Sequence, residues 1–158
     1  MYMPKPLAEI LETLELLPDP ADRAQMLIGF ADQFRDVPPD VATRPFAVEH
    51  QVPQCESEAY AWAVLQTDGT LTLHFAVESP VGISAKALAT ILAQGLSGQQ
   101  PEIIAQVSPD VVVRIFRQNI SMGKGIGLMG MVQAVQALAK RAMTPPAGPR
   151  LAISGRPD

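Results

Sequence analysis

The feature that most constrains the fold is an Asp-Gly turn, T-D-G-T at residues 67–70, between two alternating segments. Asp-Gly accepts the positive φ angles that a tight turn between antiparallel strands requires. Large and small side chains alternate through residues 59–65 before the turn, and apolar and polar ones alternate through 70–77 after it. This pattern predicts a β-hairpin, whose apolar face needs a second layer to cover it.

A third strand is expected just before the hairpin, around His50. Phe46, Val48 and Val52 alternate imperfectly there, which is typical of a short edge strand. The predicted sheet therefore has three antiparallel strands, and the connection between the first and second strands carries Cys55.

Helical periodicity flanks the predicted sheet on both sides. Apolar residues recur at helical spacing in several segments, and Asp-Pro and Ser-Pro pairs at 19–20 and 108–109 suit helix starts. Helices are predicted at residues 6–17, 20–34, 85–96 and 128–142, with shorter helices beginning near 101 and 109. The expected fold class is α+β, with a three-stranded antiparallel sheet packed on one face by helices.

The domain boundary is expected near residue 143. Residues 1–143 are predicted to form a single domain, a length that can bury a stable core. The segment that follows, 144–158, reads T-P-P-A-G-P-R-L-A-I-S-G-R-P-D and is too rich in proline and glycine to pack. It is predicted to be a disordered tail.

Composition and charge exclude several classes of protein. The 158-residue chain carries a net charge of −4 with its basic residues dispersed, so no nucleic-acid footprint is expected. No apolar run approaches the roughly 20 residues of a membrane span, and the N-terminus lacks the apolar core of a signal peptide. One cysteine cannot form an internal disulfide. These features predict a cytoplasmic protein without membrane or nucleic-acid partners.

The motif G-I-G-L-M-G at 125–130 matches the G-x-G-x-x-G pattern of dinucleotide-binding sites, but the segments around it do not fit such a site. Such a site needs a strand upstream and an acidic residue about 20 positions downstream. Here the upstream run V-V-V-R-I-F follows a helix-start signal, and no acidic residue lies between 111 and 157. We interpret the motif as a glycine-rich helix start. No metal site is expected, because a structural zinc or iron–sulfur site needs about four Cys or His ligands.

Cys55 is the strongest candidate for a reactive residue, and three interpretations of its role stay open. It could be an incidental small apolar residue. It could form a nucleophile with His50 or His74, although the sequence cannot place either histidine beside it. It could also be a thiol used for exchange, since its surroundings in V-P-Q-C-E-S-E are polar and turn-like. Glu56 and Glu58 argue against a strongly activated thiolate, because nearby negative charge opposes ionisation.

The stretch V-P-Q-C-E-S-E-A-Y-A-W resembles the cysteine loop of the SufE-type sulfur acceptor family, whose pattern is close to V-x-G-C-x-S-x-V-W. Val52, Cys55 and Ser57 match, whereas Gln54 replaces a glycine. Downstream, V-E-S-P-V-G-I-S resembles the end of the family's strand, with Pro80 as a departure. The resemblance covers roughly residues 7–143.

A second matching segment and one helix residue extend the resemblance. S-M-G-K-G-I-G-L resembles the family's Ser-Pro-Ser-Arg-x-x-Gly-Leu, with Ser121 matching and Lys124 replacing the arginine. Arg23 stands where the family often has an arginine in its second helix. The resemblance implies that Cys55 is the catalytic thiol and that Arg23, Glu56, Ser57, Ser121 and Lys124 bind the partner.

The resemblance also implies a function and its partners. In this family, a cysteine desulfurase that contains pyridoxal phosphate passes sulfur as a persulfide to the acceptor's cysteine. The acceptor relays that sulfur to an iron–sulfur cluster assembly scaffold and activates the desulfurase, without being an independent enzyme and without binding a cofactor itself. The alternative is a non-enzymatic interaction domain with an incidental cysteine. A third hypothesis is a thiol hydrolase.

Overall fold

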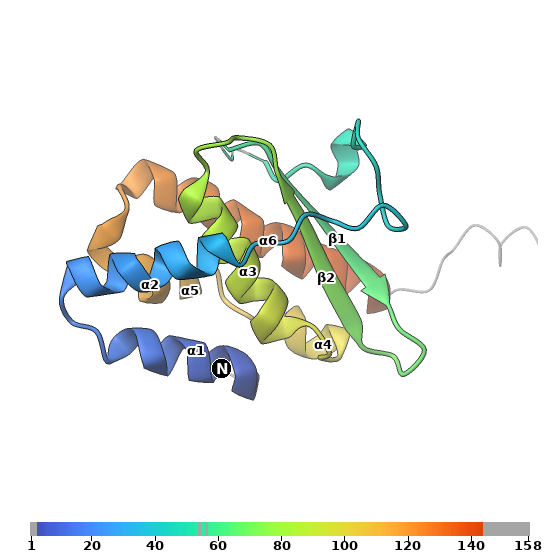
Figure 1. The fold of residues 1–158 in the computed structure, drawn as a ribbon. Coiled ribbons are helices and arrows are strands. Elements are labelled where there is room, and N and C mark those ends of the chain that lie inside the picture. Colours follow the sequence, from blue (N-terminus) through green and yellow to red (C-terminus); the bar gives the residue numbers. More distant parts are fainter. Residues whose placement is uncertain (1–2, 54, 56, 144–158) are drawn as a thin grey trace, which may run out of the picture.

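The structure is a computed structural model, and it describes residues 3–53, 55 and 57–143 (Figure 1). The segment predicted to be a disordered tail, 144–158, lies outside the described residues. The fold is α+β, as predicted. Its elements are α1 (Lys5–Glu15), α2 (Pro20–Asp32), η1 (Val48–His50), β1 (Ala59–Leu65), β2 (Leu71–Val77), α3 (Ile83–Leu96), α4 (Pro101–Ile104), α5 (Val111–Phe116), η2 (Arg117–Asn119) and α6 (Met122–Met143).

The β-hairpin forms as the Asp-Gly turn predicts. β1 and β2 pair antiparallel from Ala59 opposite Val77 to Leu65 opposite Leu71. Gly69 takes a φ of +86°, which a side chain would disfavour, and its N–H donates to the Gln66 carbonyl at 3.0 Å. The turn therefore sets the register that decides which side chains face the helices.

The two faces of the hairpin are covered by different layers. On one face, α3 packs on β2 and α6 packs on β1, and the odd-numbered side chains of β2 join the main core there (Figure 1). On the other face, Trp62 and Ala76 form a small separate cluster with Val37. The segment after α2 thus closes the face that the helices leave open.

The predicted third strand is wrong. Within the described residues, the sheet has two strands, and residues 48–50 form the short 3-10 helix η1. The N–H of His50 donates to the carbonyl of Ala47 at 3.1 Å, so this bond is local rather than cross-strand. Pairing with β1 is limited to a bridge between Gln51 and Tyr60, and Pro53 has no N–H to extend it.

The last helix begins six residues earlier than predicted. α6 starts at Met122 rather than 128, so the whole G-I-G-L-M-G motif is helical. The upstream run V-V-V-R-I-F lies in α5, also a helix. The strand that a dinucleotide site requires is therefore not there, as the sequence argument predicted. The early start matters because it brings the first turn of α6 to the cysteine loop.

Candidate functional site

The cysteine loop, residues 52–58, is fastened to the hairpin by backbone hydrogen bonds at both ends. The Val52 N–H donates to the Ala59 carbonyl at 2.8 Å, and the Ser79 N–H donates to the Ser57 carbonyl at 3.2 Å. Glu58 adopts a φ of +51°, unusual for a residue with a side chain, and its N–H donates to the Cys55 carbonyl at 3.1 Å. The chain therefore turns sharply at Cys55 and is held there.

The Cys55 pocket is a small cavity between this loop and the starts of two helices. Its lining residues are Cys55 and Ser57 from the loop, Val81, Gly82, Ile83, Ser84 and Ala85 at the start of α3, and Gly123, Lys124, Gly127 and Leu128 in α6. The cavity volume is about 30 Å³, close to the volume of one water molecule. Cys55 is half-buried and packs against the main core.

The first turns of α3 and α6 give this pocket its electrostatic character. The first N–H groups of a helix lack intrahelical partners and carry partial positive charge. Ile83 and Ser84 open α3, and Gly123 and Lys124 stand at the second and third positions of α6. An anionic sulfur at this position would therefore face two helix N-termini.

Two glycines allow the cysteine loop to approach this closely. A Cβ on Gly82 would lie 2.9 Å from Val77 Cγ1 and 3.0 Å from Ser57 Oγ. A Cβ on Gly130, in the middle of α6, would lie 2.9 Å from the Pro53 carbonyl oxygen. Gly82 therefore makes room for the side chains of Val77 and Ser57, and Gly130 makes room for the loop backbone at Pro53.

Three of the predicted site residues come together here. Ser57 and Lys124 both line the Cys55 pocket. Ser121 caps α6, because its hydroxyl accepts the Lys124 N–H at 3.2 Å, which is the usual N-cap interaction. Glu56 is not among the residues that the structure describes. The partner-binding roles of these residues stay predictions of the family resemblance.

Arg23 is not part of this group. Its side chain is buried and lines a different pocket with Arg117. Its guanidinium donates to the Ile115 carbonyl at 3.1 Å and the Leu17 carbonyl at 3.3 Å, which ties α2 to α5 and to the end of α1. Burial and then the charge of Arg117 lower the pKa of Arg23. In this conformation the side chain stabilises the helix layer and is not exposed to a partner.

Neither histidine completes a Cys–His pair in the structure. His50 Nδ1 lies 3.0 Å from the Ala61 carbonyl oxygen, and its ring stacks on Trp62. His74 lines the cleft on the other side of α3 described below. Neither lines the Cys55 pocket.

The sequence reasoning missed the exposed apolar residues near the starts of α3 and α6. Val81, Ile83, Met122 and Ile126 are large apolar side chains with exposed fractions of 80%, 51%, 85% and 55%. Val81 and Ile83 line the pocket, and the other two flank Lys124 in sequence. A usable signal was their place within the two family-like segments, V-E-S-P-V-G-I-S and S-M-G-K-G-I-G-L.

Together these features define a class: a small α+β domain that holds one half-buried thiol between two helix N-termini. Comparison with known protein families also assigns the chain to one family. The family described as "SufE: Fe-S metabolism associated domain" matches residues 8–139, so the chain belongs to the SufE family. This membership confirms the resemblance found in the sequence and places the chain in iron–sulfur metabolism.

Two individual proteins illustrate the likeness. The chain is 24% identical over 138 residues to the SufE-like protein 1, chloroplastic/mitochondrial, of Arabidopsis thaliana. That alignment covers 87% of this chain and 35% of the relative, so this chain spans about a third of the relative's length. A solution structure of a hypothetical protein from Thermus thermophilus matches with a TM-score of 0.72 at 26% identity, over 90% of this chain and 98% of that one.

Among the described helices, none has the length and apolarity that would let it span a membrane.

Proposed function

We propose that Cys55 accepts sulfur from a cysteine desulfurase as a persulfide and relays it to an iron–sulfur cluster assembly scaffold, stimulating the desulfurase. The observation that carries this proposal is the position of the Cys55 thiol, in a cavity of one-atom size between the first turns of α3 and α6. The role is that of an accessory protein rather than an independent enzyme. The cytoplasmic location predicted from the sequence stays a prediction.

The transfer itself is an exchange between sulfurs with no net oxidation. The Cys55 thiolate attacks the outer sulfur of the desulfurase persulfide, a new S–S bond forms at Cys55, and the desulfurase cysteine leaves as a thiolate. The proton on the outer sulfur stays with it. This step needs one cysteine and no cofactor on the acceptor.

The size and charge of the Cys55 pocket suit the product. A persulfide extends the cysteine by one atom, and the pocket of about 30 Å³ has room for an addition of about that size. The two helix N-termini stabilise negative charge on the outer sulfur. Leu128 and Ala85 are buried and close the inner side of the pocket.

The exposed apolar side chains of Val81 and Ile83, which line the Cys55 pocket, support docking of the desulfurase at the same place. Exposed apolar residues that gather beside a cleft are typical of protein interaction sites. Lys124 lines the same pocket and is exposed, so it adds a positive charge beside these apolar side chains. A desulfurase surface that pairs an apolar ridge with one acidic group would fit this arrangement.

The test is a sulfur-loading experiment. The protein is incubated with a cysteine desulfurase and free cysteine, and its intact mass is measured. We expect an adduct of about 32 Da per sulfur, lost on treatment with a thiol reductant. Cys55→Ser is expected to give no adduct and no stimulation of the desulfurase while its thermal unfolding stays near that of the unchanged protein.

Two outcomes would count against the proposal. An incidental cysteine predicts no adduct, with stimulation that persists in the serine variant. An adduct formed equally fast with inorganic polysulfide, a sulfane-sulfur donor, in the absence of the desulfurase would indicate an openly reactive thiol instead of a partner-gated acceptor. The hydrolase hypothesis is tested separately, by ester turnover with the protein alone.

A further inference from the structure

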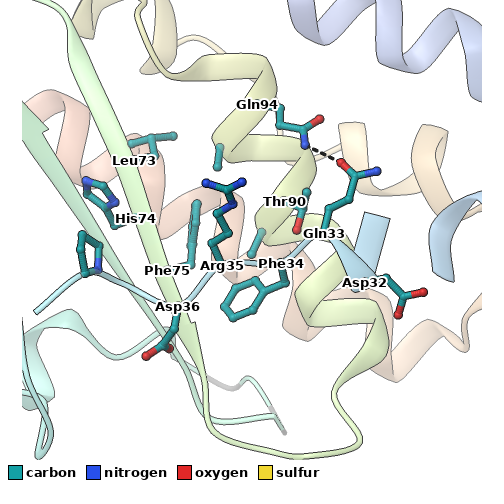
Figure 2. A pocket seen from close by; sticks show the side chains of 13 residues that line it. Asp32, Gln33, Phe34, Arg35, Asp36, Leu73, His74, Phe75, Thr90 and Gln94 are labelled. Carbon is teal, nitrogen blue, oxygen red and sulfur yellow. Dashed lines mark hydrogen bonds between the residues drawn. The ribbon is translucent and has the colours of Figure 1, made fainter. Parts of the chain in front are cut away.

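A second cleft lies between β2, α3 and the extended segment that follows α2 (Figure 2). Its volume is about 780 Å³, within the roughly 300–1,000 Å³ of typical small-molecule sites. It shares no lining residue with the Cys55 pocket. Its floor is apolar, because Leu73, Phe75 and Ala89 are buried there. The cleft is therefore a separate candidate site, which the proposed sulfur transfer does not use.

Arg35 is the cation that enters this cleft. Figure 2 shows its side chain extending into the space between β2 and α3, whereas the carboxylates of Asp32 and Asp36 point away from that space. Asp36 is already paired, since both its oxygens accept hydrogen bonds from Arg44 at 2.8 and 3.0 Å.

Arg35 differs from the other exposed arginines that hold carboxylates. Arg44 binds Asp36 and Glu78, and Arg114 binds Glu15. Among the described residues, Arg35 has no hydrogen bond and no acidic partner. Its five N–H donors, in a planar fork that matches a carboxylate, are therefore available inside a cleft.

Apart from the carboxylates of Asp32 and Asp36, which point away, the polar groups of the cleft lining are neutral. Gln94 Nε2 donates to Gln33 Oε1 at 2.9 Å, so these two neutral amides bind each other rather than Arg35. Burial lowers the pKa of His74, and the charge of Asp40 opposes this less strongly. Its imidazole is accordingly neutral at neutral pH, so Arg35 is the positive charge of the cleft lining.

From this geometry we propose that the cleft binds a small organic molecule with one carboxylate and an apolar body. The carboxylate accepts two hydrogen bonds from the Arg35 fork. The apolar body lies on Leu73 and Phe75. A doubly charged phosphate fits less well, because one cation faces the ligand and the C-terminal end of α2, with its partial negative charge, lies at the same rim.

The experiment is a titration followed by two-dimensional NMR of the 15N-labelled full chain. The probes are phenylacetate, its neutral counterpart 2-phenylethanol and the dianion phenyl phosphate. Phenylacetate is expected to shift the amide signals of Gln33, Thr90 and Gln94 saturably, with a dissociation constant of about 1 mM or below. Arg35→Gln should weaken this binding about tenfold or more, and Arg35→Lys, which keeps the charge without the fork, should weaken it less.

A matched control is Arg141→Gln, which removes one exposed arginine near the end of α6 and should leave the titration unchanged. The proposal is overturned if the shifts persist in Arg35→Gln, or if 2-phenylethanol produces them equally. Tighter binding of phenyl phosphate than of phenylacetate would overturn the assignment of a singly charged ligand. An absence of saturable shifts up to about 10 mM phenylacetate would overturn the site itself.

Discussion

The Cys55 pocket and the Arg35 cleft share α3 as a wall, but they are built from different parts of it. The first turn of α3, at Ile83–Ala85, closes the Cys55 pocket, and the middle turns, at Ala89–Gln94, floor the cleft. The pocket holds about one atom and the cleft about 780 Å³. One helix thus contributes to the proposed sulfur site and to the proposed small-molecule site.

The difference follows from where each site meets the helix. The first turn of a helix has N–H groups without partners, so the backbone itself can stabilise an anion. In the middle of a helix every backbone group is already bonded, so recognition there depends on side chains. The Cys55 pocket accordingly uses helix starts and glycines, whereas the cleft uses the side chain of Arg35.

The strongest test that the two sites are independent is a pair of variants, each of which should lose one activity and keep the other. Cys55→Ser should abolish sulfur loading completely and leave the phenylacetate titration unchanged. Arg35→Gln should abolish most phenylacetate binding and leave the mass of the sulfur adduct and its rate of formation unchanged. The two sites share no lining residue, which is the physical reason for expecting independence. Loss of both activities in either variant would show that they are one functional unit.

Because Gly130 lies against the backbone of the cysteine loop, adding one methyl group at this position should have a large effect on stability. Gly130→Ala should place a methyl group 2.9 Å from the Pro53 carbonyl oxygen, forcing the loop or α6 to shift. We expect a loss of about 1–3 kcal/mol in the free energy of unfolding, together with slower sulfur loading. Chemical denaturation and mass spectrometry measure the two effects.

The control for Gly130→Ala is Gly29→Ala in α2, where a Cβ meets nothing within 4 Å. That change should stabilise the protein by up to about 1 kcal/mol, because alanine is the better helix former. It should leave loading unchanged. Equal effects of both substitutions would contradict the close approach of the loop to α6.

Lys124 tests the rim of the same pocket. A cation in the first turn of a helix is unfavourable by about 0.3–1 kcal/mol, so Lys124→Ala should leave the melting temperature equal or slightly raised. Stimulation of the desulfurase should nevertheless fall several-fold, and more at low salt, because a rim charge acts mainly on association. Arg141→Ala, at the opposite end of α6, should leave stimulation unchanged. Unchanged stimulation in Lys124→Ala would remove it from the docking surface.

The smallest expected effect concerns Arg44, which joins the two regions. It pairs with Asp36 at the edge of the cleft and with Glu78, whose N–H donates to Glu58 at the end of the cysteine loop. These ion pairs are exposed, so Arg44→Ala should destabilise the fold by about 1 kcal/mol or less. Melting curves should show a difference that shrinks towards 1 M salt, where the Debye length is about 3 Å. A salt-independent loss would indicate packing on Phe46 as the main contribution instead.

The local elements of this fold could be predicted because their signals lie within a few residues. The Asp-Gly turn alone places Gly69 in its positive φ and pairs Leu65 with Leu71. The periodicity of α1 and the Asp19-Pro20 start of α2 require no distant partner either. The prediction of a third strand was wrong because strand pairing depends on residues far away in the sequence. Alternation around His50 is compatible with a strand, but pairing partners decide whether one forms, and the local bonds of η1 formed instead.

For the site, the sequence by itself supplied the candidate reacting atom, since Cys55 is the one cysteine and lies in a polar turn. Tertiary structure decided its surroundings, because Cys55, Ser84 and Lys124 come from three segments far apart in the chain. It also buried Arg23 on backbone carbonyls and left Arg35 without a carboxylate, a distinction that composition does not contain. Periodicity reports which face of an element is buried. Which helix starts meet, and which charges find partners, depends on how those faces pack together.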